Sequence, residues 1–170
     1  MAKAKTVREY TFHLDQETLA EIEVLAPLSI KQETYLNDNT HDIIVWGGAM
    51  AAGKTQLSLI RLMLAGMWDS NYVAGVARQS QKQMKMAGSL WDTGLKLFAP
   101  YGITSNKIET SWSFPSGAIV KCHHLYNNVE DWHGTQCTEF LVDESQQCKE
   151  EDVWFLTSRL RSKSKQKHQL

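Results

Sequence analysis

One segment of the sequence has the residue types and spacing of a loop that binds nucleotide phosphates. Residues 48–55, Gly-Ala-Met-Ala-Ala-Gly-Lys-Thr, match G-x-x-x-x-G-K-[ST] without a mismatch. Its glycines let the backbone approach an anion closely, and the N–H groups of such a loop point at phosphates. We expect Lys54 to contact the β and γ phosphates and Thr55 to offer its hydroxyl to Mg²⁺. The residues predicted to bind the nucleotide here are Gly48, Ala49, Met50, Ala51, Ala52, Gly53, Lys54, Thr55 and Gln56.

A pair of acidic residues follows about 90 residues after this loop, at the end of the apolar run 140–142. Asp143 is predicted to hold Mg²⁺, directly or through water. Glu144 is the candidate general base that polarises the water attacking the γ-phosphate. An Asp-Glu pair can also begin a helix, as the N-cap and a first-turn acid. Joined to the phosphate loop, however, the pair predicts hydrolysis of a nucleoside triphosphate.

Two further side chains are weaker candidates. Arg78 follows a predicted strand and is therefore expected at the carboxyl edge of the sheet, where ligands bind in open parallel sheets. It could contact a phosphate or pair with a nearby acid. Gln32 lies before the first predicted strand, where its amide could read the adenine edge, or it could be an exposed helical residue. A zinc site among the cysteines and histidines of residues 122–137 is not expected, because their spacing matches no closed site.

The elements that must position these residues alternate between strands and helices. Periodicity and turn residues predict strands at 43–46, 72–77 and 139–142, and a hairpin formed by 112–114 and 118–122. They predict helices at 15–26, 29–37, 53–68, 79–98 and 149–160. This alternation indicates an α/β fold with a mostly parallel central sheet flanked by helices.

Composition narrows the class of protein further. A chain of 170 residues with a net charge of −1 and 42% apolar residues is neither disordered nor too small for one core. Its longest uncharged stretches have only eleven residues, too few to span a bilayer, and no signal peptide is expected. Three cysteines without a C-x-x-C pair favour a reducing compartment. Five of the 18 basic residues lie within 159–170, a segment without acids that could contact a polyanion or be a solvated, frayed terminus.

Several shorter motifs occur in a specific order around the phosphate loop and the acidic pair. Over roughly residues 28–162, the sequence resembles the large subunit of the tailed-phage terminase, the motor that packages viral DNA. The matching segments are Lys31-Gln32, Gly47 to Thr55, Ala77-Arg78-Gln79, Ala87 to Leu90, Phe114 to Ala118, His133 to Gln136, Asp143-Glu144 and Ser158 to Ser162. The Phe-Pro-Ser-Gly-Ala and Ser-Arg-Leu-Arg-Ser segments are the most specific of them.

The resemblance implies a P-loop NTPase of the RecA-like branch that uses ATP and Mg²⁺, with the adenine-binding glutamine carried onto Gln32. It also implies a homo-oligomeric ring on the portal protein, a terminase small subunit as partner and double-stranded viral DNA as the translocated substrate. The expected location is the host cytoplasm during phage assembly, without membrane association. Some terminases have an arginine inside the phosphate loop, where this chain has Met50. An arginine finger must then come from elsewhere, and Arg78, Arg159 and Arg161 are the candidates.

The same resemblance predicts how the chain is divided. Residues 1–27 are expected to be a helical lead, 28–162 the ATPase domain and 163–170 a basic tail. Family members continue into a strand with a coupling motif and a nuclease domain, so we expect a sequence truncated at its C-terminus and without nuclease activity. Two alternatives stay open: a helicase-like nucleic-acid ATPase, and a truncated nucleotide-binding module without turnover.

Overall fold

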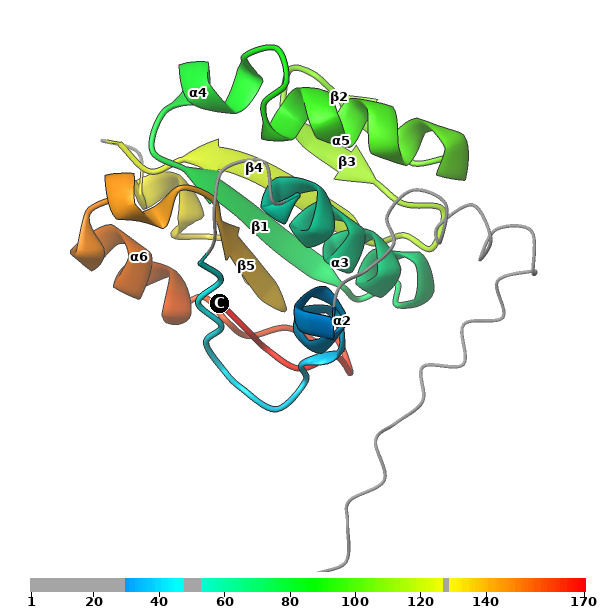
Figure 1. The fold of residues 1–170 in the computed structure, drawn as a ribbon, viewed down its shortest axis with the longest axis horizontal. Coiled ribbons are helices and arrows are strands. Elements are labelled where there is room, and N and C mark those ends of the chain that lie inside the picture. The colour runs from blue at the N-terminus through cyan, green and yellow to red at the C-terminus, as the bar shows by residue number, and fades with distance from the viewer. Residues whose placement is uncertain (1–29, 48–52, 127–128) are drawn as a thin grey trace, which may run out of the picture. The chain divides into compact units, whose positions relative to one another are not determined.

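The computed structural model describes residues 30–47, 53–126 and 129–170 (Figure 1). The chain divides into a unit of residues 1–34 and a unit of residues 35–170, and α2 (Ile30–Asn37) crosses their boundary. The predicted helix at 15–26 and residues 48–52 of the phosphate loop lie outside the described residues. The predicted helix at 29–37 is confirmed for its described part as α2.

A five-stranded sheet forms the centre of the second unit, in the order β2-β3-β4-β1-β5. The pairs β4–β1 and β1–β5 are parallel, whereas β2–β3 and β3–β4 are antiparallel. The α/β class is therefore confirmed, with parallel pairing confined to the part of the sheet that ends on the acidic pair. The strands are β1 (Val73–Arg78), β2 (Thr104–Asn106), β3 (Ser111–Ser113), β4 (Ile119–His124) and β5 (Glu139–Val142).

Helices cover both faces of this sheet (Figure 1). Alternation along β1 separates the two apolar cores, since Ala74 and Val76 face one core and Ala77 the other. The first core centres on Trp112, which stacks on Trp91 at 4.5 Å and meets Phe98 edge-on at 5.1 Å. The remaining helical elements are α3 (Lys54–Trp68), α4 (Gln81–Lys85), α5 (Leu90–Phe98), η1 (Ala99–Tyr101), η2 (Val129–Trp132), η3 (Ser145–Gln147) and α6 (Glu150–Thr157).

Two predicted elements are wrong. The single helix expected at 79–98 is two helices, α4 and α5, because Gly88 between them has a φ of +72° that a right-handed helix cannot contain. The strand expected at 43–46 is extended chain outside any strand. Among the described residues, this segment pairs with the end of the chain: Ile44 N–H donates to Leu170 at 2.9 Å, and Leu170 N–H donates to Asp42 at 2.9 Å.

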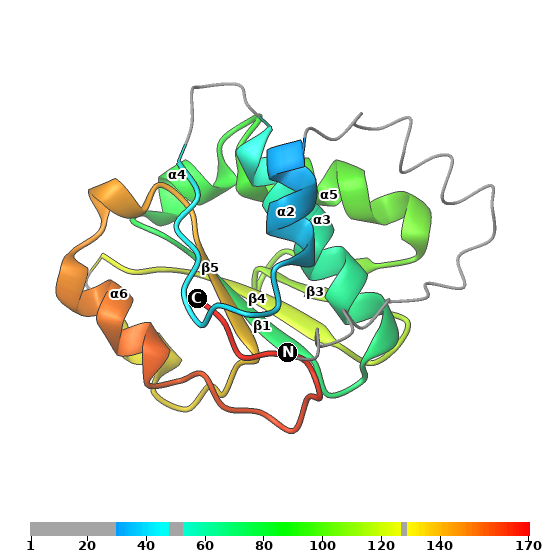
Figure 2. The same ribbon diagram turned by 60° about the horizontal axis from the view of Figure 1, so that its bottom comes forward.

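The basic C-terminal segment is folded against the rest of the unit. Ser164 donates a hydrogen bond to Asp69 Oδ2 at 2.7 Å, and Lys167 pairs with Asp42 at 2.5 Å. Figure 2 shows this segment passing beneath the sheet and ending beside the chain that leads away from α2. The expectation of a frayed terminus is therefore wrong for this segment. Within the described ranges, no helix combines the length and apolarity needed to cross a bilayer.

Candidate functional site

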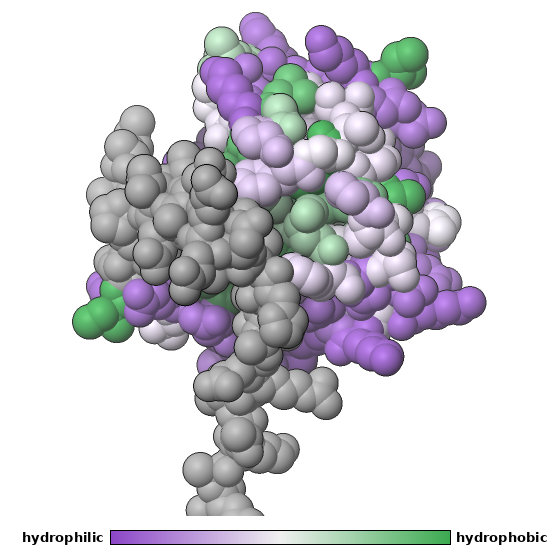
Figure 3. Space-filling view, turned by 90° about the vertical axis from the view of Figure 1, so that its right-hand side faces the viewer, coloured by the Kyte–Doolittle hydropathy of each residue, from purple (hydrophilic) through white to green (hydrophobic). Residues whose placement is uncertain are grey.

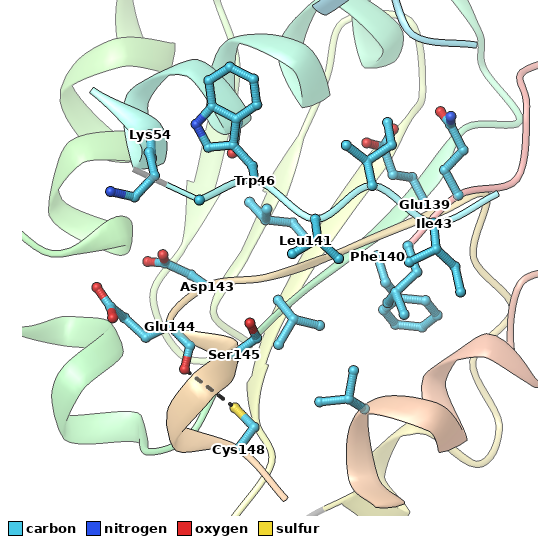
Figure 4. Close-up of a pocket in the computed structure, with 18 of the residues that line it drawn as sticks. Ile43, Trp46, Lys54, Glu139, Phe140, Leu141, Asp143, Glu144, Ser145 and Cys148 are labelled. Carbon is cyan, nitrogen blue, oxygen red and sulfur yellow. Dashed lines mark hydrogen bonds between the residues drawn. The ribbon is translucent and has the colours of Figure 1, made fainter. Parts of the chain in front are cut away.

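A cavity of about 710 Å³ opens along β5 and collects most of the described residues that the sequence singled out. Lys54 and Thr55 line it from the first turn of α3, and Asp143 and Glu144 line it from the end of β5. Figure 4 shows Lys54, Asp143 and Glu144 together at one end of the cavity, with Ile43 and Glu139 at the other. The two motifs, far apart in sequence, therefore meet in one place.

The start of α3 is set by Gly53. This residue has φ 69° and ψ 15°, a left-handed conformation that costs glycine little and other residues about 1 kcal/mol or more. It turns the chain so that Lys54 is the first residue of the helix, with its side chain in the cavity. The N–H groups of a helix's first turn have no partner within the helix, which favours an anion at this position. Gln56 lies one residue further along α3, half-buried and outside the cavity lining.

The acidic pair leaves β5 through a strained turn. Asp143 N–H still donates to Ala77 at 2.9 Å, so the sheet holds this residue in place. Glu144 then adopts φ 55° and ψ 44°, a left-handed conformation that costs a non-glycine residue about 1–3 kcal/mol. The turn places both carboxylates at the carboxyl edge of the parallel strands. Strain of this kind, here at Glu144, occurs often at functional sites.

Arg78, at the end of β1, is the basic partner of both acids. Its Nε lies 3.6 Å from Asp143 Oδ2, and its Nη2 lies 3.8 Å from Glu144 Oε1. Both separations are ion-pair distances that are too long for hydrogen bonds. Within the described structure, Arg78 Nε and Asp143 Oδ2 are buried and have no hydrogen-bond partner. Within the described residues, this guanidinium donates one hydrogen bond, from Nη1 to the carbonyl of Gln83 at 2.8 Å.

The electrostatic surroundings favour a cation beside Asp143. Burial raises the pKa of Asp143; Arg78 opposes this, Glu144 adds to it, and Lys54 lowers it. A buried carboxylate with an orphaned oxygen, next to a second carboxylate and a helical hydroxyl, is the donor set that Mg²⁺ prefers. Thr55, Asp143 and Glu144 therefore fit a magnesium site. Within the described ranges, this site included, no group of three or more His, Cys, Asp or Glu side chains is placed to hold a metal.

The other predicted residues are distributed as follows. Arg78 is brought to the acidic pair, as one of its two interpretations expected. Gln32 lies in the unit of residues 1–34, so it is not placed relative to the cavity. The predicted contacts of Gly48, Ala49, Met50, Ala51 and Ala52 lie outside the described residues.

Sequence reasoning missed several side chains of the cavity. Trp46 reads as a core residue in the sequence, yet it is half-buried, lines the cavity and lies 4.9 Å from the ring of Tyr35. Cys148 lines the same cavity from the turn after the acidic pair, and burial raises the pKa of its thiol. The proximity of both residues to the predicted motifs was the available signal, but no residue pattern distinguished them.

A comparison with known protein families, with curated proteins and with solved structures found no match for this chain. The site is therefore described by its geometry alone. It contains a helix N-terminus with a lysine, two carboxylates at a strand end, and an arginine close to both.

Proposed function

We propose that this protein is the ATP-hydrolysing portion of a tailed-phage terminase large subunit, with a P-loop NTPase fold, that drives double-stranded viral DNA into a procapsid. One observation carries the proposal. Lys54, which belongs to a complete phosphate-loop motif, lines the same cavity as Asp143 and Glu144, which directly follow strand β5. A phosphate cradle facing an acidic strand end is the arrangement that phosphoryl transfer to water requires.

Each residue then has a defined task. The Lys54 ammonium offsets the charge that develops on the β and γ phosphates. Thr55 and Asp143 hold Mg²⁺, which supplies further neutralisation of the phosphate oxygens when it is bound. Glu144 accepts a hydrogen bond from the attacking water and orients it in line with the bond that breaks. Gln32 is proposed to read the adenine edge and Gln56 to belong to the nucleotide-binding set.

The contacts of the three candidate arginines narrow the choice of the arginine finger. Arg159 lies over the Phe155 ring at 5.0 Å and donates to the carbonyl of His133 at 3.0 Å, so it is held within its own subunit. Arg78 is beside the acidic pair and is suited to act within the same subunit. Arg161 is exposed. We therefore propose Arg161 as the residue that reaches a neighbouring subunit.

The proposed setting is a homo-oligomeric ring on the portal protein, together with the terminase small subunit, in the host cytoplasm during phage assembly. Nuclease activity is not proposed for these residues. A helicase-like ATPase would use the same cavity but would unwind duplexes and would not bind a portal. A nucleotide-binding module without turnover would bind ATP through Lys54 and leave Glu144 without a role.

The test is ATP turnover by the 170-residue chain with and without double-stranded DNA. We expect DNA to stimulate turnover and phosphate release to require Mg²⁺. Unwinding of a tailed duplex would favour the helicase-like alternative. Tight ATP binding without phosphate release, unchanged by DNA and portal protein, would leave only the binding module.

A further inference from the structure

The short helix η3, which directly follows the acidic pair, carries two glutamines with side-chain contacts of their own. Gln146 and Gln147 are both exposed. Exposure alone is not informative, because the described surface in Figure 3 is mainly hydrophilic with small, separated apolar spots. Each glutamine, however, shares a hydrogen bond with another side chain, Gln146 with Glu144 and Gln147 with Gln83 of α4. η3 therefore contacts both the acidic pair and a neighbouring helix.

Gln146 holds one oxygen of the Glu144 carboxylate. Its side-chain amide donates to Glu144 Oε2, and both side chains line the cavity. Two backbone hydrogen bonds fix the turn that carries them. Gln147 N–H donates to the carbonyl of Glu144 at 2.9 Å, and Cys148 N–H donates to the carbonyl of Ser145 at 3.0 Å. The amide that contacts the carboxylate is thus attached to an ordered turn.

Gln147 connects η3 to the residue that holds Arg78. Gln83 Nε2 donates to Gln147 Oε1 at 2.9 Å, and the backbone carbonyl of Gln83 accepts from Arg78 Nη1 at 2.8 Å. Gln83 is itself placed by the start of α4, because its N–H donates at 3.3 Å to the side chain of Ser80, the N-cap. Gln83 thus contacts both the guanidinium and the turn after the acidic pair.

These contacts close into a ring around the Glu144 carboxylate. On one side, Arg78 Nη2 lies 3.8 Å from Glu144 Oε1. On the other side, Gln146 donates to Oε2. The Glu144 side chain is long, flexible and 39% exposed, so it would sample several orientations without these contacts. A general base must lie within hydrogen-bond reach of the water that it activates, and the ring limits the orientations of this base.

We propose that Gln83, Gln146 and Gln147, here called the glutamine clasp, are positioning residues for Glu144. The clasp holds Oε2 so that Oε1 faces the attacking water. It belongs to the hydrolytic site of the proposed function and rests on that function, but none of its members has to contact ATP. Gln146 acts directly on the carboxylate, whereas Gln147 acts through Gln83 by fixing η3 against α4. Loss of the clasp should therefore slow phosphate release and leave ATP affinity unchanged.

The test makes the same chemical change at two neighbouring residues of the whole chain. Gln146→Glu replaces an amide donor by a carboxylate that repels Glu144, whereas Gln147→Glu keeps an oxygen that accepts from Gln83. Both variants add one negative charge to η3, so each controls for the other. ATP affinity and single-turnover phosphate release are measured with Mg²⁺, beside Gln81→Ala at an exposed glutamine of α4.

The two charge-adding variants should differ in rate and not in binding. We expect Gln146→Glu to release phosphate at least about tenfold more slowly, a part of the 100- to 10,000-fold or so that a general base contributes. Gln147→Glu should retain at least about half of the parental rate, and Gln81→Ala should match the parent. ATP affinity should be unchanged throughout, and melting temperatures should stay within about 2 °C of the parent, because the substituted side chains are exposed.

A second measurement detects the contacts without nucleotide. The side-chain amide signals of Gln146 and Gln147 are followed by NMR in Glu144→Gln and in Gln83→Ala. We expect Glu144→Gln to shift the signals of Gln146 more than those of Gln147, and Gln83→Ala to do the reverse. This pattern does not depend on ATP hydrolysis.

Three results would overturn the proposal. Equal rates of phosphate release from Gln146→Glu and Gln147→Glu would show that the contact with Glu144 does not matter. Slower release by Gln146→Glu with a matching loss of ATP affinity or of melting temperature would assign Gln146 to binding or to the fold. Equal NMR shifts of both glutamines in both variants would contradict the contacts. Absence of phosphate release from the parent would instead contradict the proposed function, so the two proposals fail separately.

Discussion

β5 carries an arginine–carboxylate cluster at each end, and the two clusters differ in their distances and hydrogen bonds. At its amino end, Arg61 Nε donates to Glu139 Oε1 at 2.8 Å and Tyr72 donates to Glu139 Oε2 at 2.9 Å. At its carboxyl end, Arg78 stands 3.6 and 3.8 Å from Asp143 and Glu144. The first cluster is closed by hydrogen bonds, whereas the second leaves buried polar atoms of both partners unsatisfied.

The difference separates a cluster that joins several elements from one whose buried polar atoms lack partners within the described structure. Arg61 also donates to the carbonyls of Tyr35 and Asp38, at 2.6 and 3.0 Å, and to the side chain of Gln169. It therefore ties α2's last turn, α3, β5 and the C-terminus together. At the other end, Asp143 Oδ2 has no hydrogen-bond partner within the described structure, and Glu144 accepts one side-chain hydrogen bond, from the exposed amide of Gln146. Unsatisfied buried groups cost stability, and they persist where function uses them.

The largest effect on stability is expected from breaking the closed cluster. Arg61→Ala leaves the buried Glu139 without its positive partner and removes the hydrogen bonds to Tyr35, Asp38 and Gln169, so we expect the free energy of unfolding to fall by about 3–5 kcal/mol. Glu139→Gln is the matched control, because it keeps the shape and loses only the charge, and its loss should be smaller. Urea unfolding measures both. A loss below about 1 kcal/mol for Arg61→Ala would mean that this cluster does not hold the unit together.

Removal of a single donor from that cluster should have an intermediate effect. Tyr72→Phe takes away the hydroxyl that satisfies Glu139 Oε2, and an unsatisfied buried acceptor costs about 1–3 kcal/mol. Burial and the neighbouring Glu139 raise the pKa of Tyr72, so its hydroxyl remains a donor throughout the neutral range. The melting temperature should fall by about 2–4 °C for each kcal/mol lost in a chain of this size. An unchanged melting temperature would contradict the contact.

Arg78→Ala tests the cluster of Arg78, Asp143 and Glu144. Here we expect a small change in stability and a fall in turnover. The ion pairs of Arg78 are longer than hydrogen bonds and less buried than the pair of Arg61 and Glu139, so we expect a smaller loss in the free energy of unfolding than for Arg61→Ala. Turnover should fall, because the guanidinium is the positive charge nearest to both acids. Arg78→Lys keeps the charge without the fork and should recover part of the rate. A stability loss as large as that of Arg61→Ala would show that the two clusters do not differ.

The smallest effect on stability is expected from neutralising Asp143. Burial raises the pKa of this carboxyl, so the folded state binds its proton more tightly than the unfolded state does. Its contribution to stability is therefore greatest below the unfolded pKa and is lost as the pH rises through the folded pKa. Asp143→Asn has no titrating carboxyl at this position, so it does not lose stability as the pH rises through the folded pKa of Asp143. The variant should be slightly more stable than the parent at pH 7 and lose this advantage toward pH 3, while turnover is abolished. A variant less stable than the parent at pH 7 would contradict the sign.

The sequence predicted those elements in which local pattern and final environment agree. β5 was predicted with its observed bounds, because its apolar run is buried and ends on two acids. The phosphate-loop pattern likewise predicted the start of α3 within a residue. The helix expected at 79–98 failed at Gly88, where turn geometry overrides a helical period. The Arg61 cluster could not be predicted, since it joins residues from four parts of the chain.

Residues 43–46 show a different limit of prediction from sequence. Their apolar run is typical of a buried strand, but a strand exists only where a neighbour supplies hydrogen bonds, and here that neighbour extends only to Leu170. In the candidate site, Lys54, Asp143 and Glu144 line one cavity, and their roles in binding and catalysis stay predictions. The sequence left the role of Arg78 open between a phosphate and an acid, because that choice depends on distances that only the fold determines.

The central claim is that Lys54 and Glu144 serve one ATP-hydrolysing site, and a split between binding and turnover tests it most directly. ATP affinity and single-turnover phosphate release are measured for the parent, Lys54→Ala and Glu144→Gln in the presence of Mg²⁺. The account predicts that Glu144→Gln binds ATP as the parent does but releases phosphate at least about 100-fold more slowly, whereas Lys54→Ala loses binding as well. Equal rates of phosphate release from all three proteins would contradict it.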